Sequence, residues 1–169
     1  MTPGATTKIL YFAYGSNMLS RRLRERTPSA VVIGTGYVSG RRLTFDKVST
    51  DHSGKCNIEV SASPTDRVYG VLFEFNAAEK SNLDAKEKSY HEDHIQVVTS
   101  SGTREAMTYV AISKEPALRP YHCYKALVIA GATEHHLPDF YIEWLRTVDS
   151  KPDPNASRRA RKEAFLLGS

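Results

Sequence analysis

Short apolar and alternating runs dominate the first half of the chain. The first is "KILYFA", and four more follow at intervals set by Gly, Ser, Asp and Pro. Runs rich in β-branched and aromatic residues, bounded by turn residues, are typical of strands. The pattern therefore predicts strands at 8–13, 30–38, 41–47, 56–63 and 67–75.

A helix is predicted directly after the first strand. Ser16 or Asn17 can cap its N-terminus, because both side chains can accept a hydrogen bond from a free backbone N–H group. Leu19 and Leu23 are four residues apart and give the helix one apolar edge. Pro28 marks the boundary beyond which the helix does not continue.

A second helix is predicted after the block of strands. The segment 76–88 begins with Asn76 and carries Glu79 three residues later, a spacing close to a capping box. Two further strands are predicted near 94–99 and 105–112, where apolar and polar residues alternate again.

The last third of the chain has helical patterns. Segment 121–132 is predicted to end at Gly131, a residue type common just after a helix. In the next helix, at 137–148, Phe140, Trp144 and Val148 are spaced four apart.

The composition is that of an ordinary globular protein. The chain has 169 residues, of which 40% are hydrophobic and 25% charged, so we expect one domain with its own core. Strands followed by helices predict an α+β domain at 8–149, a mixed, mostly antiparallel sheet or barrel surrounded by α-helices. The basic tail at 150–169 is either frayed or a short helix.

The start of the chain lacks the basic and apolar regions of a secretory signal, and no apolar run approaches the roughly 20 residues of a membrane span. We therefore expect a cytoplasmic protein that does not bind a membrane. Cys56 and Cys123 are far apart and belong to no CxxC motif. Both are expected to be reduced, buried thiols.

The net charge of +4 invites a nucleic-acid interpretation, and the arginines fall into three clusters. No aromatic RNA-binding motif, zinc-finger spacing or helix-turn-helix signal accompanies them. We therefore expect no nucleic-acid partner and interpret the arginines as solvated helix faces. A basic rim that attracts an anionic small substrate is the alternative.

The junction "YGSN" has features of an anion-binding loop. Gly15 allows a ligand to approach the main chain, and the N–H groups before a helix can hold an anion or a developing oxyanion. Tyr11 and Tyr14 can flank that position. The alternative is a well-capped turn, with Ser16 and Asn17 as the caps and the tyrosines in the core.

A second candidate is Glu87, three residues after Asp84 in a predicted helix. The helix dipole near a C-terminus disfavours negative charge, and partial burial acts in the same direction, so the pKa of Glu87 is expected to be raised toward the range useful for proton transfer. Lys86 and Lys88 oppose this shift. An ordinary exposed glutamate between lysines is the alternative.

The sequence contains no motif that is typical of metal or nucleotide chemistry. "YHEDH" at 90–94 and "EHH" at 134–136 lack the HExxH spacing, so both are interpreted as polar surface segments. A GxSxG elbow, a Walker loop and a GxGxxG motif are also absent. No metal site is therefore predicted, and classical hydrolase or nucleotide chemistry has no support in the sequence.

Three motifs, taken together, resemble the γ-glutamylcyclotransferase family with its AIG2-like relatives. "YFAYGSNM" resembles the family's signature loop, "LDAKE" its LDxxEG segment with the catalytic glutamate, and "YKALVIAGATEHHLP" a third conserved block. Their order and spacing agree with the family from Tyr11 to about Trp144. Lys88 stands where the family usually has glycine, and this departure bears on backbone geometry and substrate choice.

The resemblance implies an enzyme that acts on γ-glutamyl amides without a cofactor. The substrate's α-amino group attacks its own γ-carbonyl, and 5-oxoproline and a free amine or amino acid leave. On this resemblance Glu87 is the catalytic acid/base. The implied substrate-binding residues are Tyr11, Phe12, Ala13, Tyr14, Gly15, Ser16, Asn17 and Tyr124.

Several alternatives remain open from the sequence. The leaving group can be an amino acid, an amine or part of a biosynthetic intermediate; glutathione ranks lower, because the glutathione-specific branch resembles YGSL where this chain has Asn17. The protein can be a monomer or a homodimer. A non-catalytic module that binds a small ligand on the same fold is the alternative function.

Overall fold

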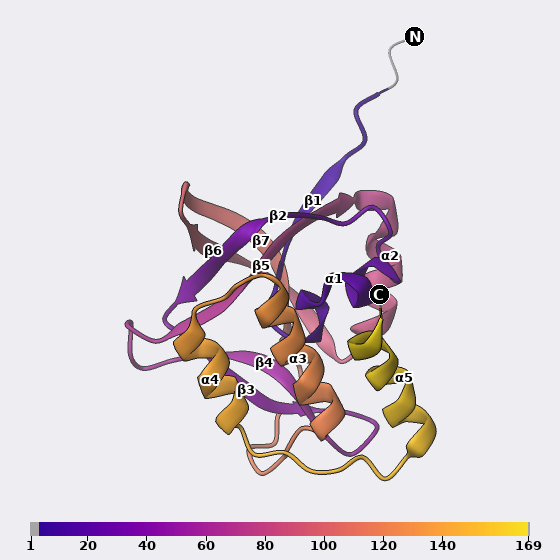
Figure 1. Ribbon diagram of the computed structural model, residues 1–169. Helices are drawn as coiled ribbons and strands as arrows, with labels where there is room; N and C mark the ends of the chain where they lie inside the picture. The colour runs from indigo at the N-terminus through magenta and orange to yellow at the C-terminus, as the bar shows by residue number, and fades with distance from the viewer. Residues whose placement is uncertain (1–3, 169) are drawn as a thin grey trace.

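The computed structural model describes residues 4–168. Five strands form a closed barrel in the order β1-β5-β2-β6-β7, in which β1 and β7 pair in parallel and all other neighbours are antiparallel (Figure 1). The barrel strands are β1 (Lys8–Ala13), β2 (Val31–Ser39), β5 (Arg67–Asn76), β6 (Tyr90–Thr99) and β7 (Gly102–Ala111). The predicted α+β domain with a mostly antiparallel barrel is confirmed.

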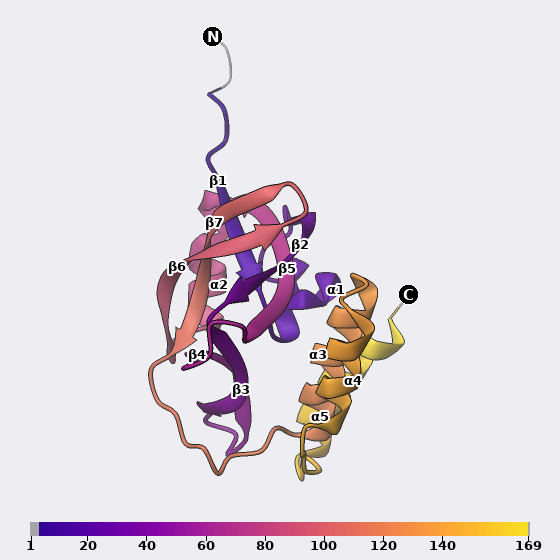
Figure 2. The same cartoon turned by 90° about the vertical axis from the view of Figure 1, so that its left-hand side faces the viewer.

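A separate two-stranded hairpin extends from the barrel. It consists of β3 (Arg41–Val48) and β4 (Gly54–Val60), which pair only with each other in the sheet (Figure 2). The register shifts between Thr44 and Lys47, so the hairpin is irregular where it later meets the functional site.

Helices α3, α4 and α5 form a layer on one side of the barrel and hairpin (Figure 2). Among residues 4–168, no helix is long and apolar enough to cross a membrane. The helices and the two 3₁₀ turns are η1 (Ser16–Met18), α1 (Ser20–Arg24), η2 (Ala77–Glu79), α2 (Lys80–Lys86), α3 (His122–Glu134), α4 (Asp139–Thr147) and α5 (Ala156–Leu167).

The core lies inside the barrel and between the barrel and the helix layer. Phe12, Phe73 and Phe75 from neighbouring strands are fully buried, and Val128 of α3 and Leu145 of α4 pack on them from the helices. Each such side chain contributes roughly 1.5–3 kcal/mol relative to an exposed position.

The apolar spacing in α4 does not mark its buried face. Phe140 and Trp144 are 66% and 42% exposed, whereas Tyr141, Ile142 and Leu145 face the core. The burial pattern repeats at three and four residues, so the buried stripe lies one residue after the spacing of Phe140 and Trp144.

The predicted capping of the first helix is wrong. Neither Ser16 nor Asn17 caps η1, and α1 begins only at Ser20. The Ser20 N–H and hydroxyl groups donate to Glu134, 3.1 and 2.7 Å away at the end of α3. A carboxylate distant in sequence therefore replaces the local cap, while Ser16 accepts a hydrogen bond from Arg22.

The prediction of a capping box at the second helix is also wrong. The Asn76 side chain accepts a hydrogen bond from Lys8 instead of capping η2, and the Glu79 carboxylate accepts the Ser29 N–H at 3.2 Å. Both side chains connect the helix start to neighbouring segments, because cationic and backbone donors from those segments lie within their reach.

The helix was predicted to end at Gly131, and this is wrong. Gly131 lies inside α3. A Cβ atom at this position would lie 2.6 Å from the Met18 Cβ and 2.7 Å from the Leu19 backbone nitrogen. The glycine therefore allows α3 to pack directly on η1, the turn that starts at the serine of "YGSN".

The basic segment after 150 forms α5, which packs against α3. Asn155 caps α5 by accepting the Arg158 N–H at 2.9 Å, and the Arg158 guanidinium binds the buried Asp153 carboxylate. Lys162 of the same helix is only 8% exposed.

Candidate active site

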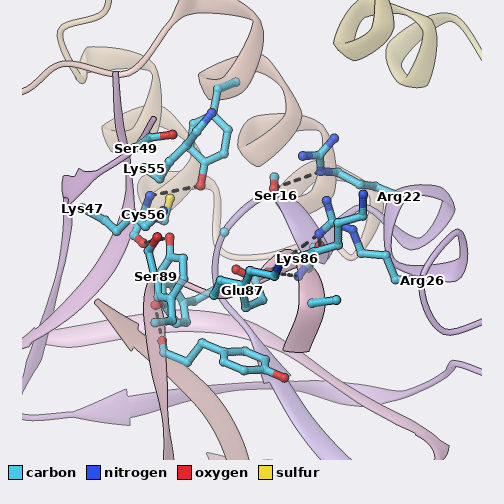
Figure 3. Close-up of a pocket in the computed structure, with 18 of the residues that line it drawn as sticks. Ser16, Arg22, Arg26, Lys47, Ser49, Lys55, Cys56, Lys86, Glu87 and Ser89 are labelled. Carbon is cyan, nitrogen blue, oxygen red and sulfur yellow. Dashed lines mark hydrogen bonds and ion pairs between the residues drawn. The ribbon is translucent and has the colours of Figure 1, made fainter. Parts of the chain in front are cut away.

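A cavity of about 330 Å³ opens where three segments distant in sequence meet. The loop after β1 forms one side, the C-terminal end of α2 lies in the middle, and the β3–β4 hairpin forms the other side (Figure 3). The residues predicted for the site that line it are Tyr11, Tyr14, Gly15, Ser16, Asn17, Glu87 and Tyr124.

Two predicted binding residues lie elsewhere. Phe12 and Ala13 are 0% and 1% exposed, belong to the barrel core and do not line the cavity. Tyr14 and Gly15 line the cavity because β1 ends at Ala13 and the chain leaves the sheet there.

Glu87 directly follows α2 and projects into the middle of the cavity. Its side chain is 15% exposed. Its Oε1 atom accepts a hydrogen bond from the Asn17 amide at 3.0 Å, and the Arg26 guanidinium lies 3.7 Å from the same oxygen. Lys88 does not adopt a positive φ, so lysine at the family's glycine position causes no left-handed strain.

Burial raises the pKa of Glu87, which confirms the predicted direction of the shift. The charge of Arg26 and the hydrogen bond from Asn17 partly oppose this effect. Desolvation, and not the helix dipole alone, is thus the physical cause. A carboxyl group with a raised pKa can both accept a proton and return it.

Asn17 links Glu87 to two neighbouring side chains by hydrogen bonds. Its Nδ2 group also donates to the Tyr11 hydroxyl at 3.1 Å, and its Oδ1 atom accepts from Arg26 at 2.8 Å. Burial raises the pKa of Tyr11, so this hydroxyl keeps its proton and remains a donor toward the cavity.

The backbone after β1 presents free donors. In the described part of the chain, the N–H groups of Gly15, Ser16 and Asn17 donate to no other protein group. A Cβ atom at residue 15 would lie 3.0 Å from the Cys56 Cβ and 3.4 Å from the Tyr124 hydroxyl. Glycine thus lets the loop pack against the hairpin and α3.

Tyr124 connects α3 to the hairpin. Its hydroxyl accepts the Cys56 backbone N–H at 3.0 Å, and the Lys55 ammonium lies 4.4 Å from the centre of its ring. Tyr90 donates to the Cys56 carbonyl at 2.8 Å. The hairpin edge is therefore held by aromatic hydroxyl groups from two other elements.

The cavity is also lined by residues that were not predicted for the site, among them Arg26, Lys47, Lys55 and Tyr90. Lys47 had a signal of its own. Leu43 and Phe45 alternate along β3, and Lys47 takes the next position of that period, where an apolar residue is usual. The other three lie outside the three motifs, and only the fold brings them to the site.

The predicted surface role of "EHH" is wrong in part. Glu134 holds the start of α1, and His135 lies 2.8 Å from the Met18 carbonyl oxygen, so both secure the loop that precedes α1. Within residues 4–168, no group of three His, Cys, Asp or Glu side chains is arranged to hold a metal ion. Cys56 and Cys123 are free and buried.

Comparison with known proteins matches residues 67–145 to the AIG2-like family model. The chain is 34% identical to bovine γ-glutamylcyclotransferase over 149 residues and 33% identical to the human protein of that name; each match covers 83% of this chain and 78% of the relative. The chain belongs to the γ-glutamylcyclotransferase family.

Solved structures support the same placement. A protein titled γ-glutamyl cyclotransferase matches with a TM-score of 0.85 and 28% identity, covering 96% of this chain and 100% of that one. An uncharacterized human protein matches with a TM-score of 0.81 and 28% identity, covering 92% and 98%. The family's fold therefore extends over nearly the whole chain, including the elements that form the cavity.

Proposed function

We propose that the protein is a γ-glutamylcyclotransferase that cleaves γ-glutamyl amides by cyclisation, releasing 5-oxoproline and a free amine or amino acid. One observation carries this proposal. A buried carboxylate with a raised pKa, Glu87, faces a loop of free N–H groups within a single cavity. Membership of the family supports the same activity.

The first step is intramolecular. Glu87 takes a proton from the substrate's α-ammonium group, and the resulting amine attacks the γ-carbonyl carbon to form the new C–N bond. Because the nucleophile is tethered to its target, the protein needs only to hold the glutamyl chain in a folded conformation. The tyrosines that line the cavity restrict that conformation.

The second requirement is stabilisation of the oxyanion. The attack turns the γ-carbonyl oxygen into an alkoxide, and the N–H groups of Gly15 to Asn17 are available to donate to it or to the substrate's α-carboxylate. These donors are fixed in place by packing of α3 on η1, so they need no reorganisation during the reaction.

Collapse of the tetrahedral intermediate completes the reaction. The protonated Glu87 gives its proton to the amide nitrogen and the old C–N bond breaks. The ring nitrogen then passes its second proton, through Glu87, to the departing amine, which leaves as an ammonium. Glu87 returns to its starting state. The Asn17 hydrogen bond and the Arg26 charge both engage Oε1, which keeps the other oxygen, Oε2, free for the substrate.

The arginines support a small-molecule substrate rather than a nucleic acid. Arg22 and Arg26 line the cavity, and Arg158 is bound to the buried Asp153. These clusters are therefore divided between the site and the fold and are not a continuous outer stripe. We further propose a cytoplasmic location; the choice between monomer and homodimer stays a prediction.

Glu87→Gln tests the proposed function. We expect 5-oxoproline release from a panel of γ-glutamyl amides, measured by mass spectrometry, to fall at least 100-fold in this variant. Glu105→Gln is the matched control, because Glu105 is 64% exposed and lies outside the cavity. A folded Glu87→Gln variant with near-normal turnover contradicts the role of Glu87. Saturable binding by the native protein without any 5-oxoproline release indicates the non-catalytic module.

A further inference from the structure

The guanidinium group of Arg22 lies between the cavity and the C-terminal helix α5. Arg22 lines the cavity from α1, and its Nε group donates to the Ser16 hydroxyl at 3.1 Å (Figure 3). On the other side, the guanidinium carbon lies 5.5 Å from the centre of the Phe165 ring. One arginine therefore connects the loop of free N–H groups to a helix that contributes none of the described residues lining the cavity.

The neighbouring Arg26 is held differently. Its guanidinium donates to the Asn17 side chain at 2.8 Å and lies 3.7 Å from the Glu87 carboxylate. Within residues 4–168, Arg22 has no carboxylate within 4.0 Å, and the Ser16 hydroxyl is its one hydrogen-bond acceptor. A single hydrogen bond fixes a long, flexible side chain only in part. The ring of α5 is therefore the second contact that determines where the Arg22 guanidinium lies.

Helix α5 is itself held at both ends. At its start, the buried Asp153 carboxylate binds Arg158. At its end, the Gly168 carbonyl oxygen accepts a hydrogen bond from Arg21 of α1. Figure 1 shows the end of α5 near α1, and the helix packs along α3. Phe165 is thus presented to α1 by a docked helix and not by a free tail.

The aromatic ring suits the electrostatics of Arg22. Burial lowers the pKa of Arg22 to about 10, and the charge of Arg26 acts in the same direction. The side chain still carries its charge at neutral pH. A cation over an aromatic face is attracted to the negative side of the ring, and this attraction grows where water is excluded. The Phe165 ring therefore favours the charged guanidinium at a place where burial opposes it.

We propose that Phe165 is a positioning residue of the active site. It acts through Arg22, which in turn holds Ser16 and the loop of free N–H groups in the arrangement that the reaction requires. The C-terminal helix thus completes an active site whose cavity it does not line. The proposal rests on the function proposed above and extends its machinery to α5.

A double-mutant cycle tests the proposal. Phe165→Leu removes the ring and keeps the apolar bulk, and we expect kcat/KM for 5-oxoproline release to fall roughly 3- to 30-fold, the range of a cation–π contact. In an Arg22→Met background the same substitution should change kcat/KM less than about twofold, because the residue through which Phe165 acts is gone. Phe165→Tyr keeps the ring and should restore native kinetics to within about twofold.

Leu167→Ala is the matched control on α5. Leu167 is 86% exposed, and we expect this variant to keep kcat/KM within about twofold of the native value. A Phe165→Leu variant with a lower Tm and unchanged kcat/KM shows that Phe165 only anchors the helix, and overturns the proposal. An equal loss in the native and Arg22→Met backgrounds also overturns it, since the effect would not pass through Arg22.

A titration without substrate separates this proposal from the proposed function. Burial raises the pKa of Glu87, and the charges of Arg26, Lys47 and Arg22 oppose that effect. A less tightly held Arg22 lies farther from Glu87 on average. We therefore expect Phe165→Leu to raise the pKa of Glu87 by about 0.3 pH unit, followed by the ¹³C NMR shift of the carboxyl group.

The two proposals can fail separately. Native protein that releases no 5-oxoproline refutes the proposed function, while the NMR titration still decides whether Phe165 acts on the site. An unchanged titration curve for Glu87 in Phe165→Leu overturns the role of Phe165 and leaves the proposed function in place.

Discussion

The two sides of the cavity are built on different principles. On the loop wall, formed by residues 11–26 around Glu87, the polar side chains complete one another: Asn17 contacts Tyr11, Arg26 and the carboxylate at once. On the hairpin wall, formed by residues 47–56, the cation of Lys47 has no such partner within the part of the chain that the structure describes. The loop wall, which carries Glu87, is therefore preorganised by side chains of the protein, and the hairpin wall is less so.

After loss of Glu87 itself, the largest effect is expected from Asn17→Ala. The change removes the donor to Glu87 and leaves Arg26 without its amide acceptor. We expect kcat to fall about 100-fold, the size typical of losing one preorganised donor, as measured by 5-oxoproline release at saturating substrate. A kcat within twofold of the native value would show that the loop wall does not depend on this network.

Gly131→Ala tests how the loop wall is held. The new Cβ would approach Met18 and Leu19 to within 2.6–2.7 Å, so we expect the free energy of unfolding to fall by about 1–3 kcal/mol. The glycine control is Gly34→Ala, where a Cβ meets nothing within 4 Å. Equal urea-unfolding midpoints for both variants would contradict this account of the packing.

Arg26→Met separates charge from geometry on the loop wall. Glu87 must be ionised to accept a proton, so kcat/KM rises with pH through the pKa of Glu87. Burial raises this pKa, and the acidic limb of the pH profile therefore lies above the usual range of a glutamate. Arg26 opposes this shift. Removing it should therefore move the acidic limb of the pH profile upward, by roughly one pH unit. A limb that stays in place, or moves to lower pH, contradicts the assignment of the limb to Glu87.

Tyr124→Phe should have the smallest effect, on the hairpin wall. The Cys56 N–H loses its acceptor, and we expect a loss of about 1 kcal/mol in the free energy of unfolding. Tyr37→Phe on β2 is the comparison variant, because no hydrogen bond of the Tyr37 hydroxyl is found in residues 4–168. Chemical denaturation of both variants measures the difference, and similar losses would mean that the Tyr124 hydroxyl does not secure the hairpin.

The fold could be predicted where local pattern and tertiary environment agree. β1 begins and ends where its apolar run does, and the β2 and β5 strands lie within one residue of the predicted bounds. β6 begins earlier than predicted, at Tyr90, because pairing with β7 overrides the polar sequence "YHEDH". The caps failed for a similar reason: charged groups from distant segments, such as Glu134 at Ser20, satisfy the helix start.

The sequence by itself determined the motifs, their order and the residue types that can move a proton or hold an anion. Glu87 and the "YGSN" loop could be chosen from it because the three motifs, taken together and in order, resemble the γ-glutamylcyclotransferase family. Only the tertiary structure decided that Phe12 and Ala13 lie in the core, that Lys47 faces the same cavity as Glu87, and that desolvation sets the pKa of the carboxyl group. The distances between groups far apart in sequence are set only when the barrel closes, and a local pattern indicates which residues are buried but not which of them meet.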